Sequence, residues 1–186
     1  MRKLISSINI TLDGFCDHTA MIADEELHQN VNDLLRSTDT MIFGRVTYEL
    51  MKTSWPPIVK NPTGNKPMDE FAVLIDNIEK VVFSRTMKRA GWHNARIAKG
   101  TLSEEILNLK KQPGKDIGAG GPSILIQLMN LDLIDEYQFN IQPIILGRGL
   151  PLFKNITDRV DLKLIETKAQ GSGVVTMVYE RTGNRH

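Results

Sequence analysis

The sequence has almost no cysteine. Cys16 is the only one among its 186 residues, so the chain cannot form an intrachain disulfide or a cysteine-based zinc site. A lone cysteine is typical of proteins from a reducing compartment. The first residues are basic, but they then alternate between apolar and polar instead of forming the apolar centre of a signal peptide. We therefore expect a cytoplasmic protein.

Long apolar runs and an excess of one charge are also missing. No apolar run approaches the roughly 20 residues that a membrane span requires. The 23 Lys and Arg residues almost balance the 22 Asp and Glu residues, which leaves a net charge of +1. This balance gives no electrostatic reason to bind nucleic acid or an anionic membrane. The composition, 41% hydrophobic and 24% charged, is that of a globular protein, and the length favours one domain over residues 1–186.

Two kinds of catalytic motif are absent. The four histidines, His18, His28, His93 and His186, show no metal-binding spacing such as His-Glu-x-x-His, so we expect no metal site. The chain also lacks the Gly-x-Ser-x-Gly sequence of the nucleophile elbow, which argues against a hydrolase of that type.

What the sequence does contain is a repeated switch between the apolar period of a strand and that of a helix, which is typical of an α/β protein. Short apolar or alternating segments predict strands at residues 4–10, 41–43, 81–83, 115–117, 137–141, 162–169 and 174–179. Helices are predicted after a cap at Asp24, over about 45–51, after Thr101 or Ser103, and from Pro122. The Pro-rich stretch 55–67 is predicted to be a surface loop. We expect a three-layer α/β sandwich, with a mostly parallel central sheet and antiparallel strands at its C-terminal edge.

Three polar junctions each follow a short apolar strand. They are Gly44-Arg45-Val46-Thr47, Ser84-Arg85 and the Gly-rich turn Gly118-Ala119-Gly120-Gly121. Ligands of open α/β sheets bind at the carboxyl ends of the strands, and a phosphate binds well where a helix begins. The Gly-rich turn matches neither the Walker A loop nor the dinucleotide-binding fingerprint. Ordinary tight turns and solvated arginines are the alternative interpretation.

Asp13 follows the first predicted strand and precedes Gly14. An Asp-Gly pair is commonly a simple turn. Its place at the carboxyl end of a strand makes a role facing the substrate an equal alternative.

Four segments, taken together and in this order, resemble the dihydrofolate reductase superfamily. They are residues 7–15 (SINITLDGF), 43–49 (FGRVTYE), 117–122 (IGAGGP) and 143–153 (PIILGRGLPLF). The nearest likeness is to the branch that contains the reductase domain of the bifunctional riboflavin-biosynthesis deaminase/reductase. The last segment is characteristic of this branch and is not expected in a dihydrofolate reductase itself. The likeness covers nearly the whole chain.

The resemblance implies a largely parallel sheet that binds NADPH across its carboxyl edge. The segment Gly44-Arg45-Val46-Thr47 is implied to hold the phosphates of the cofactor at a helix N-terminus. The pair Ser84-Arg85 is implied to meet the adenosine 2′-phosphate. The segment Gly118-Ala119-Gly120-Gly121 is implied to pass beneath the pyrophosphate and the nicotinamide.

On the substrate side, the resemblance implies Asn9, Leu12, Asp13 and Trp55. Asp13 is the first candidate for a catalytic contact or proton relay, with water as the alternative proton donor. The implied activity is hydride transfer from NADPH to a C=N or C=O bond of a small heterocycle. That heterocycle is pteridine-like, as in dihydrofolate reductases, or aminopyrimidine-like, as in 5-amino-6-(5-phosphoribosylamino)uracil reductases. The riboflavin branch also implies a homodimer.

The first predicted helix departs from the dihydrofolate reductase pattern. Those enzymes carry a carboxylate there that holds the substrate ring, whereas counting back from Gly44 without gaps places His28 at this position. A small gap would bring Asp24, Glu25 or Glu26 there instead. A non-catalytic protein that binds a nucleotide or a pteridine is therefore the alternative to a reductase.

Overall fold

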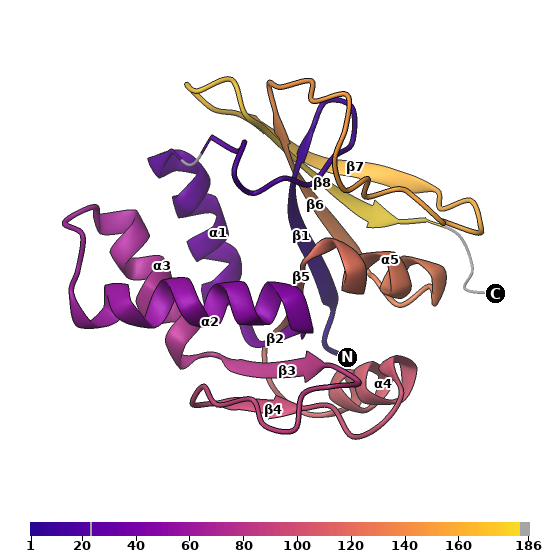
Figure 1. The fold of residues 1–186 in the computed structure, drawn as a ribbon. Helices are drawn as coiled ribbons and strands as arrows, with labels where there is room; N and C mark the ends of the chain where they lie inside the picture. Colours follow the sequence, from indigo (N-terminus) through magenta and orange to yellow (C-terminus); the bar gives the residue numbers. More distant parts are fainter. Residues whose placement is uncertain (23, 183–186) are drawn as a thin grey trace.

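The computed structural model is built on one sheet, whose strands follow the order β4-β3-β2-β5-β1-β6-β8-β7 (Figure 1). The structure describes residues 1–22 and 24–182, so His186 lies outside the described residues. The strands are β1 (Leu4–Thr11), β2 (Thr38–Gly44), β3 (Glu79–Phe83), β4 (Ala95–Ile97), β5 (Asp116–Gly120), β6 (Glu136–Gln142), β7 (Leu162–Ala169) and β8 (Val175–Arg181). The helices are α1 (Glu25–Ser37), α2 (Arg45–Lys60), α3 (Lys66–Asn77), α4 (Leu102–Lys111) and α5 (Pro122–Asn130).

All strand pairs from β4 across to β6 are parallel, and β8 runs antiparallel to both β6 and β7. The expected mostly parallel sheet with an antiparallel C-terminal edge is confirmed. The first strand, β1, lies between β5 and β6. The strand order therefore reverses beside β1, and such a switch point is where open α/β sheets bind ligands.

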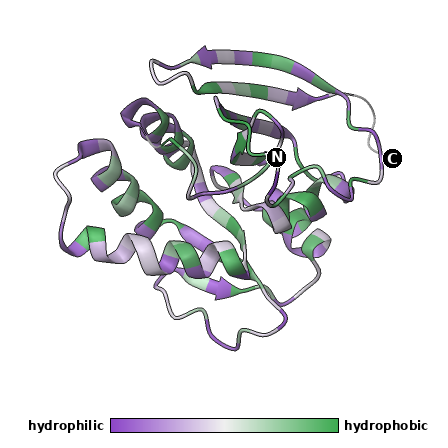
Figure 2. Ribbon diagram, turned by 45° about the horizontal axis from the view of Figure 1, so that its top comes forward, coloured by the Kyte–Doolittle hydropathy of each residue, from purple (hydrophilic) through white to green (hydrophobic). Residues whose placement is uncertain are grey.

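Helices cover the two faces of the sheet, which confirms the three layers. One apolar core joins the sheet to α4 and α5, and a second joins the opposite face to α1, α2 and α3. Figure 1 shows these two groups of helices on either side of the strands. The hairpin of β7 and β8 extends beyond the helices, and Figure 2 shows hydrophilic and hydrophobic residues in alternation along it. Because β7 is an edge strand with most of its residues exposed, this part of the sheet remains open on one side.

Strand β6 is more buried than its sequence predicts. The alternation of apolar and polar residues predicts a strand with one solvent-exposed face. In the structure, however, Gln138, Asn140 and Gln142 are all buried. These polar side chains lie on the opposite face of β6 from Tyr137 and Phe139, which belong to or pack on the first core. The buried face is therefore polar.

The predicted surface loop at 55–67 is wrong. Helix α2 continues through Pro56 and Pro57, and α3 begins only a few residues later. Each proline removes a helical N–H and costs about 3 kcal/mol in a helix interior, which is why the sequence predicts a break. Packing of α2 on α3 offsets this cost, because the Trp55 and Phe71 rings lie 4.3 Å apart in that interface.

Some features that define other protein classes are absent from the described residues. No helix there is both long and apolar enough to cross a bilayer. The same part of the chain holds no group of three His, Cys, Asp or Glu side chains that is arranged to bind a metal ion. Burial raises the pKa of the Cys16 thiol to about 11, so this cysteine stays protonated and unreactive at neutral pH.

Candidate functional site

The five helices in the described part of the chain differ in how their first turns are capped. In α1, α3 and α4 the side chains of Asp24, Asn65 and Thr101 accept a hydrogen bond from a first-turn N–H. In α2 and α5 the N-cap residues are Gly44 and Gly121, and no side chain provides this bond. The first-turn N–H groups of these two helices therefore remain available to an anion.

The two uncapped helix N-termini lie side by side, because they follow the neighbouring strands β2 and β5. A Cβ atom placed on Gly44 would lie 3.0 Å from Ser123 Oγ, and one placed on Gly121 would overlap the Thr47 side chain. Each of the two helices therefore places a side-chain hydroxyl against the N-cap glycine of the other helix. We call Gly44, Thr47, Gly121 and Ser123 the two-helix cradle. It provides N–H and O–H donors from both helices at one point of the sheet edge.

The predicted Gly-rich turn is only partly a turn, so this prediction needs correction. Gly118, Ala119 and Gly120 belong to β5, and only Gly121, with φ of +98°, forms the turn. A Cβ on Gly118 would overlap the Met41 side chain. Gly118 therefore makes room for the core under α1–α3, while Ala119 is part of the other core. These residues form a strand because β5 pairs with β2 in the centre of the sheet. The small residues of β5 leave room for large side chains of β2 to lie over them.

The predicted phosphate-binding residues Arg45, Val46, Ser84 and Arg85 all lie at the carboxyl ends of β2 and β3. Arg45 Nη1 donates to Glu49 Oε2 (2.9 Å) on the exposed side of α2, and Val46 is exposed as well. Ser84 Oγ accepts from the N–H of Met87 (3.0 Å) and so stabilises the turn after β3. The adjacent Arg85 is exposed.

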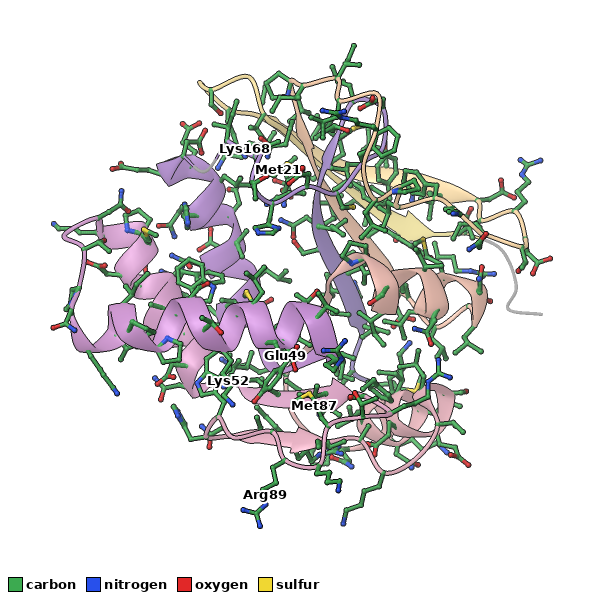
Figure 3. All side chains as sticks on the ribbon, in the orientation of Figure 1. Met21, Glu49, Lys52, Met87, Arg89 and Lys168 are labelled. Carbon is green, nitrogen blue, oxygen red and sulfur yellow. The ribbon has the colours of Figure 1, made fainter. Side chains whose placement is uncertain are left out.

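A hydrogen bond farther along α2 joins this helix to the loop after β3. Lys52 Nζ donates to the carbonyl of Ala90 at 3.0 Å. Figure 3 shows Glu49 and Lys52 on α2 and Met87 on the loop, with Arg89 directed away from the sheet. The loop that carries Ser84 and Arg85 is thereby held beside α2.

Asp13 acts as a hydrogen-bond acceptor between two loops. Its carboxylate accepts from Thr11 Oγ1 (2.6 Å), from the N–H of Gly147 (2.7 Å) and from that of Leu146 (3.2 Å). The Thr11 hydroxyl, followed by the Gly147 N–H, lowers the pKa of the Asp13 carboxyl. Asp13 is therefore ionised at neutral pH, which suits it to hold a loop and makes it a poor proton donor.

Backbone hydrogen bonds join the same two loops. The N–H of Leu12 donates to the carbonyl of Ile144 (2.9 Å), and that of Cys16 donates to Leu150 (2.8 Å). The first and last of the four family-like segments, 7–15 and 143–153, are thus one structural unit. Sequence reasoning found both segments but not their contact, because they are separated by more than half of the chain.

The structure brings Asn9, Leu12 and Asp13 together at the carboxyl end of β1. Leu12 is 63% exposed, and Asn9 is half-buried. Trp55 lies elsewhere, because its ring packs on Phe71 and its Nε1 donates to the Met51 sulfur (3.2 Å). Its substrate-side role stays a prediction.

None of the three acidic residues at the start of α1 takes the place of the missing carboxylate. Asp24 caps the helix, Glu25 accepts from the N-cap side chain of α3 at 3.4 Å, and Glu26 accepts from the N–H of Gly171 at 2.9 Å. His28 lies edge-on to the Phe71 ring, with the centroids 6.3 Å apart. Asp33, farther along α1, accepts from Gln29 and Arg36 of the same helix. Within the described part of the chain, no acid of this helix therefore has a hydrogen bond to a strand of the sheet.

Sequence reasoning missed two groups of polar residues. Ser123 was not singled out, although a hydroxyl that follows a glycine and a proline at a helix start is a readable signal. The buried residues Asn140, Thr176 and Gln170 form a hydrogen-bonded group beside Asn9. No local pattern marks these three, because they meet only through the pairing of strands.

A cavity of about 670 Å³ lies apart from the cradle. It is open to solvent on one side and is lined by the end of β1, by β6 and β8, and by the segment that follows 143–153. Its lining is mostly apolar and includes the rings of Tyr137, Phe139, Phe153 and Tyr179. Leu12 is the predicted site residue that also lines this cavity.

The sheet order and the antiparallel last strand β8 define a dihydrofolate reductase-like fold. Within that class, the chain belongs to the RibD C-terminal domain family, whose model matches residues 2–176. This confirms the resemblance read from the four segments.

Relatives and solved structures agree with this membership. YyaP of Bacillus subtilis (strain 168), an uncharacterized protein, is 34% identical over 188 residues, which cover 98% of this chain and 96% of YyaP. A protein of Shewanella sp. PV-4, described provisionally as a riboflavin biosynthesis protein, superposes with a TM-score of 0.76 at 20% identity and covers 97% and 99% of the two chains. A dihydrofolate reductase from Enterococcus faecalis, complexed with NADP(H), superposes with a TM-score of 0.63 at 14% identity and covers 97% of each chain. These superpositions show a shared fold.

Proposed function

We propose that this protein is an NADPH-dependent reductase that transfers a hydride to a small pteridine-like or aminopyrimidine-like heterocycle. The observation that carries the proposal is the two-helix cradle. Of the five described helices, three have an N-cap side chain that accepts a first-turn N–H. The other two, α2 and α5, lack such a cap, and their N-termini meet at the carboxyl edge. Uncapped N–H groups in such a place are suited to a phosphate-bearing ligand.

The residues at this edge fit the parts of NADPH. Two adjacent helix N-termini match the two linked phosphoryl groups of a dinucleotide, and Thr47 and Ser123 add hydroxyl donors. Arg85 and Arg45, at the ends of the next strands, are the cations proposed for the 2′-phosphate. The full set proposed to hold the cofactor is Gly44, Arg45, Val46, Thr47, Ser84, Arg85, Gly118, Ala119, Gly120 and Gly121, with Ser123 added. Bound there, NADPH would supply the hydride.

Asn9, Leu12 and Asp13 are proposed to line the substrate side, with Trp55 as a more distant member. The ionised Asp13 holds the 143–153 loop against β1 and thereby shapes this side. Its lowered pKa leaves water as the better proton donor for the reduced heterocycle.

The contacts of the acidic residues in and before α1 also support a second candidate, a protein that binds NADPH and a pteridine without turnover. The N-cap Asp24 and the α1 residues Glu25 and Glu26 are engaged elsewhere. The remaining acid of α1, Asp33, accepts from Gln29 and Arg36 of the same helix. A binding protein needs no proton donor, whereas a reductase must obtain the proton from solvent.

The test is a titration of NADPH, followed by fluorescence, and then stopped-flow absorbance after mixing with dihydropteridines and aminopyrimidines. Saturable NADPH binding and oxidation in the presence of one of these substrates supports the reductase. Tight binding with no oxidation across the panel supports the binding protein. If NADPH does not bind, both are wrong.

The proposal extends to the whole of residues 1–186 as one domain that acts as a homodimer in the cytoplasm. Exposed apolar side chains support the dimer, since Leu164 and Ile165 on the edge strand β7 are 47% and 51% exposed. Ile145 and Phe153 are exposed as well, by 75% and 52%. Sedimentation at micromolar concentration is the test, and a species of monomer mass contradicts the dimer.

A further inference from the structure

The cavity of about 670 Å³ beside β6 and β8 is lined by four aromatic rings that the proposed reaction does not use. Tyr137 and Phe139 project from one face of β6, and Tyr179 of β8 pairs in register with Tyr137. Phe153 reaches the same cavity from the 143–153 loop, and Met129 reaches it from α5. The cavity therefore lies on the face of the sheet that α5 covers, opposite to α1.

The four rings form one cluster with Phe139 at its centre. The centroid of the Phe153 ring lies 5.9 Å from that of Phe139, and the two ring planes meet at 68°. The Tyr179 ring lies 6.2 Å away at 59°, and the Tyr137 ring lies 6.0 Å away at 29°. Each ring carries partial negative charge on its two faces. Four rings around one cavity therefore lower the energy of a cation placed among them.

The charged residues at the rim of the cavity also favour a cation. Asp158 and Arg159 are the two charged residues that line it. The side chain of Arg159 is 86% exposed, and its Nε donates to Asp161 Oδ1 at 2.8 Å, so that its positive charge is balanced. The Asp158 carboxylate accepts from the Thr157 hydroxyl (2.9 Å). Within the described part of the chain it has no ion pair, which leaves its negative charge available to a ligand.

The rest of the lining restricts the kind of cation. Apart from Thr11 and the two charged residues, the side chains that line the cavity are apolar or aromatic. A primary ammonium group has three N–H donors, and burying them without acceptors is costly. A nitrogen that carries only carbon substituents has no N–H to satisfy, and its alkyl groups pack well on the rings and on the polarizable sulfurs of Met129 and Met177.

We propose that this cavity is a second ligand site, which binds an organic cation whose charge is surrounded by alkyl groups, as in a quaternary ammonium compound. The four rings hold the charged group, and Asp158 complements it at the rim. The volume lies within the range of about 300–1,000 Å³ that is typical of small-molecule sites, so the ligand carries further apolar groups. The proposal is independent of the reductase activity, because the cavity and the α1 side of the sheet are on opposite faces.

Two probes of the same shape test the proposal. Binding of choline and of its neutral isostere 3,3-dimethylbutan-1-ol, in which carbon replaces the charged nitrogen, is measured by calorimetry at neutral pH. We expect choline to bind about tenfold more tightly, since the neutral alcohol keeps the apolar contacts and loses the attraction to the rings and to Asp158. Equal affinity, or tighter binding of the alcohol, would show an ordinary apolar pocket and overturn the proposal. Binding of neither probe, as when a second copy of the chain covers the cavity, would also overturn it.

Substitution of single rings locates the binding. Phe153 is 52% exposed, so Phe153→Leu should fold, keep an apolar side chain and lose only the ring. We expect its affinity for choline to fall several-fold, with little change for the neutral alcohol. Phe153→Tyr, which keeps a ring, should retain the wild-type affinity for choline. Tyr179→Leu tests a second ring in the same way, and unchanged choline binding in both leucine variants contradicts the proposal.

The carboxylate at the rim is tested with a matched pair of exposed acids. Asp158→Asn should weaken choline binding about two- to threefold, a small effect because the charge is exposed to solvent. Glu166→Gln is the control, because Glu166 pairs in register with Val178 and so faces the other side of the sheet from Tyr179. Equal affinities for choline in the two variants would remove Asp158 from the site. NADPH is titrated separately, and failure of the wild type to bind it counts against the proposed function alone.

Discussion

The proposed cofactor side and the proposed substrate side of the carboxyl edge are built differently. The cradle is made of two short segments, 44–47 and 121–123, and consists of backbone N–H groups, glycines and hydroxyls. The proposed substrate side combines Asn9, Leu12 and Asp13 at the end of β1 with the 143–153 loop, and these two segments meet only in the folded protein. A site made from local backbone leaves a readable motif, whereas a contact between distant segments does not.

The largest effect is expected at the turn of the cradle. Gly121→Ala should lower the free energy of unfolding by about 2–4 kcal/mol, because φ of +98° is strained for alanine and its Cβ overlaps Thr47. Calorimetric unfolding measures this. Gly171→Ala, at a glycine with open space around it, is the control and should change stability little. If Gly121→Ala is as stable as the wild type, the tight contact between α2 and α5 is wrong.

The next largest effect is expected at the two arginines of the proposed cofactor site, where binding of NADPH is compared with binding of NADH. Arg85→Ala and Arg45→Ala should each weaken NADPH binding about ten- to a hundredfold, or about 1.5–3 kcal/mol, through the lost bond to the 2′-phosphate. NADH binding should change little. Titration of both cofactors measures this, and Arg89→Ala, whose side chain points away from the sheet in Figure 3, serves as the control. A wild type that does not distinguish NADPH from NADH would refute the assignment.

A smaller effect is expected for the hydroxyl that sequence reasoning missed. Ser123→Ala should weaken NADPH binding by about 1 kcal/mol, roughly fivefold, with no change in thermal stability. Ser103→Ala is a matched control, because Ser103 is likewise the second residue of its helix, but that helix is capped by Thr101. Equal losses in the two variants would mean that the cradle hydroxyl has no special contact.

The smallest effect concerns Asp13 and pH. Its pKa is lowered in the folded protein from 3.8, so its contribution to stability is present above that value and is lost as the pH falls through the folded pKa. Asp13→Asn should therefore have a slightly lower melting temperature than the wild type at neutral pH, and the difference should shrink in acid. A difference that stays constant from neutral pH to below 3.8 would show that the carboxylate charge is not what holds the 143–153 loop.

Prediction from the sequence succeeded where the signal was local. The strand from Leu4, the cap at Asp24 and the helix start at Pro122 are all found in the structure, because capping and periodicity act over a few residues. Prediction failed at Pro56 and Pro57, where local preference ends a helix but packing on α3 continues it. It also placed Gly118 in a turn, although the space above Gly118 is filled by Met41 from a neighbouring strand.

The sequence alone therefore determined the order of the described strands and helices except β4 and α3, which it did not predict. It also determined the glycines at the helix starts and, through four short segments, the family. The tertiary structure decided that α2 and α5 each place a hydroxyl against the N-cap glycine of the other helix. It also decided that Asp13 binds the 143–153 loop, and that Asn9, Asn140 and Thr176 are aligned across neighbouring strands. The physical reason is the range of the forces involved. Backbone geometry and capping are fixed by neighbours in the chain, whereas strand register and the pairing of buried polar groups depend on residues more than 100 positions apart.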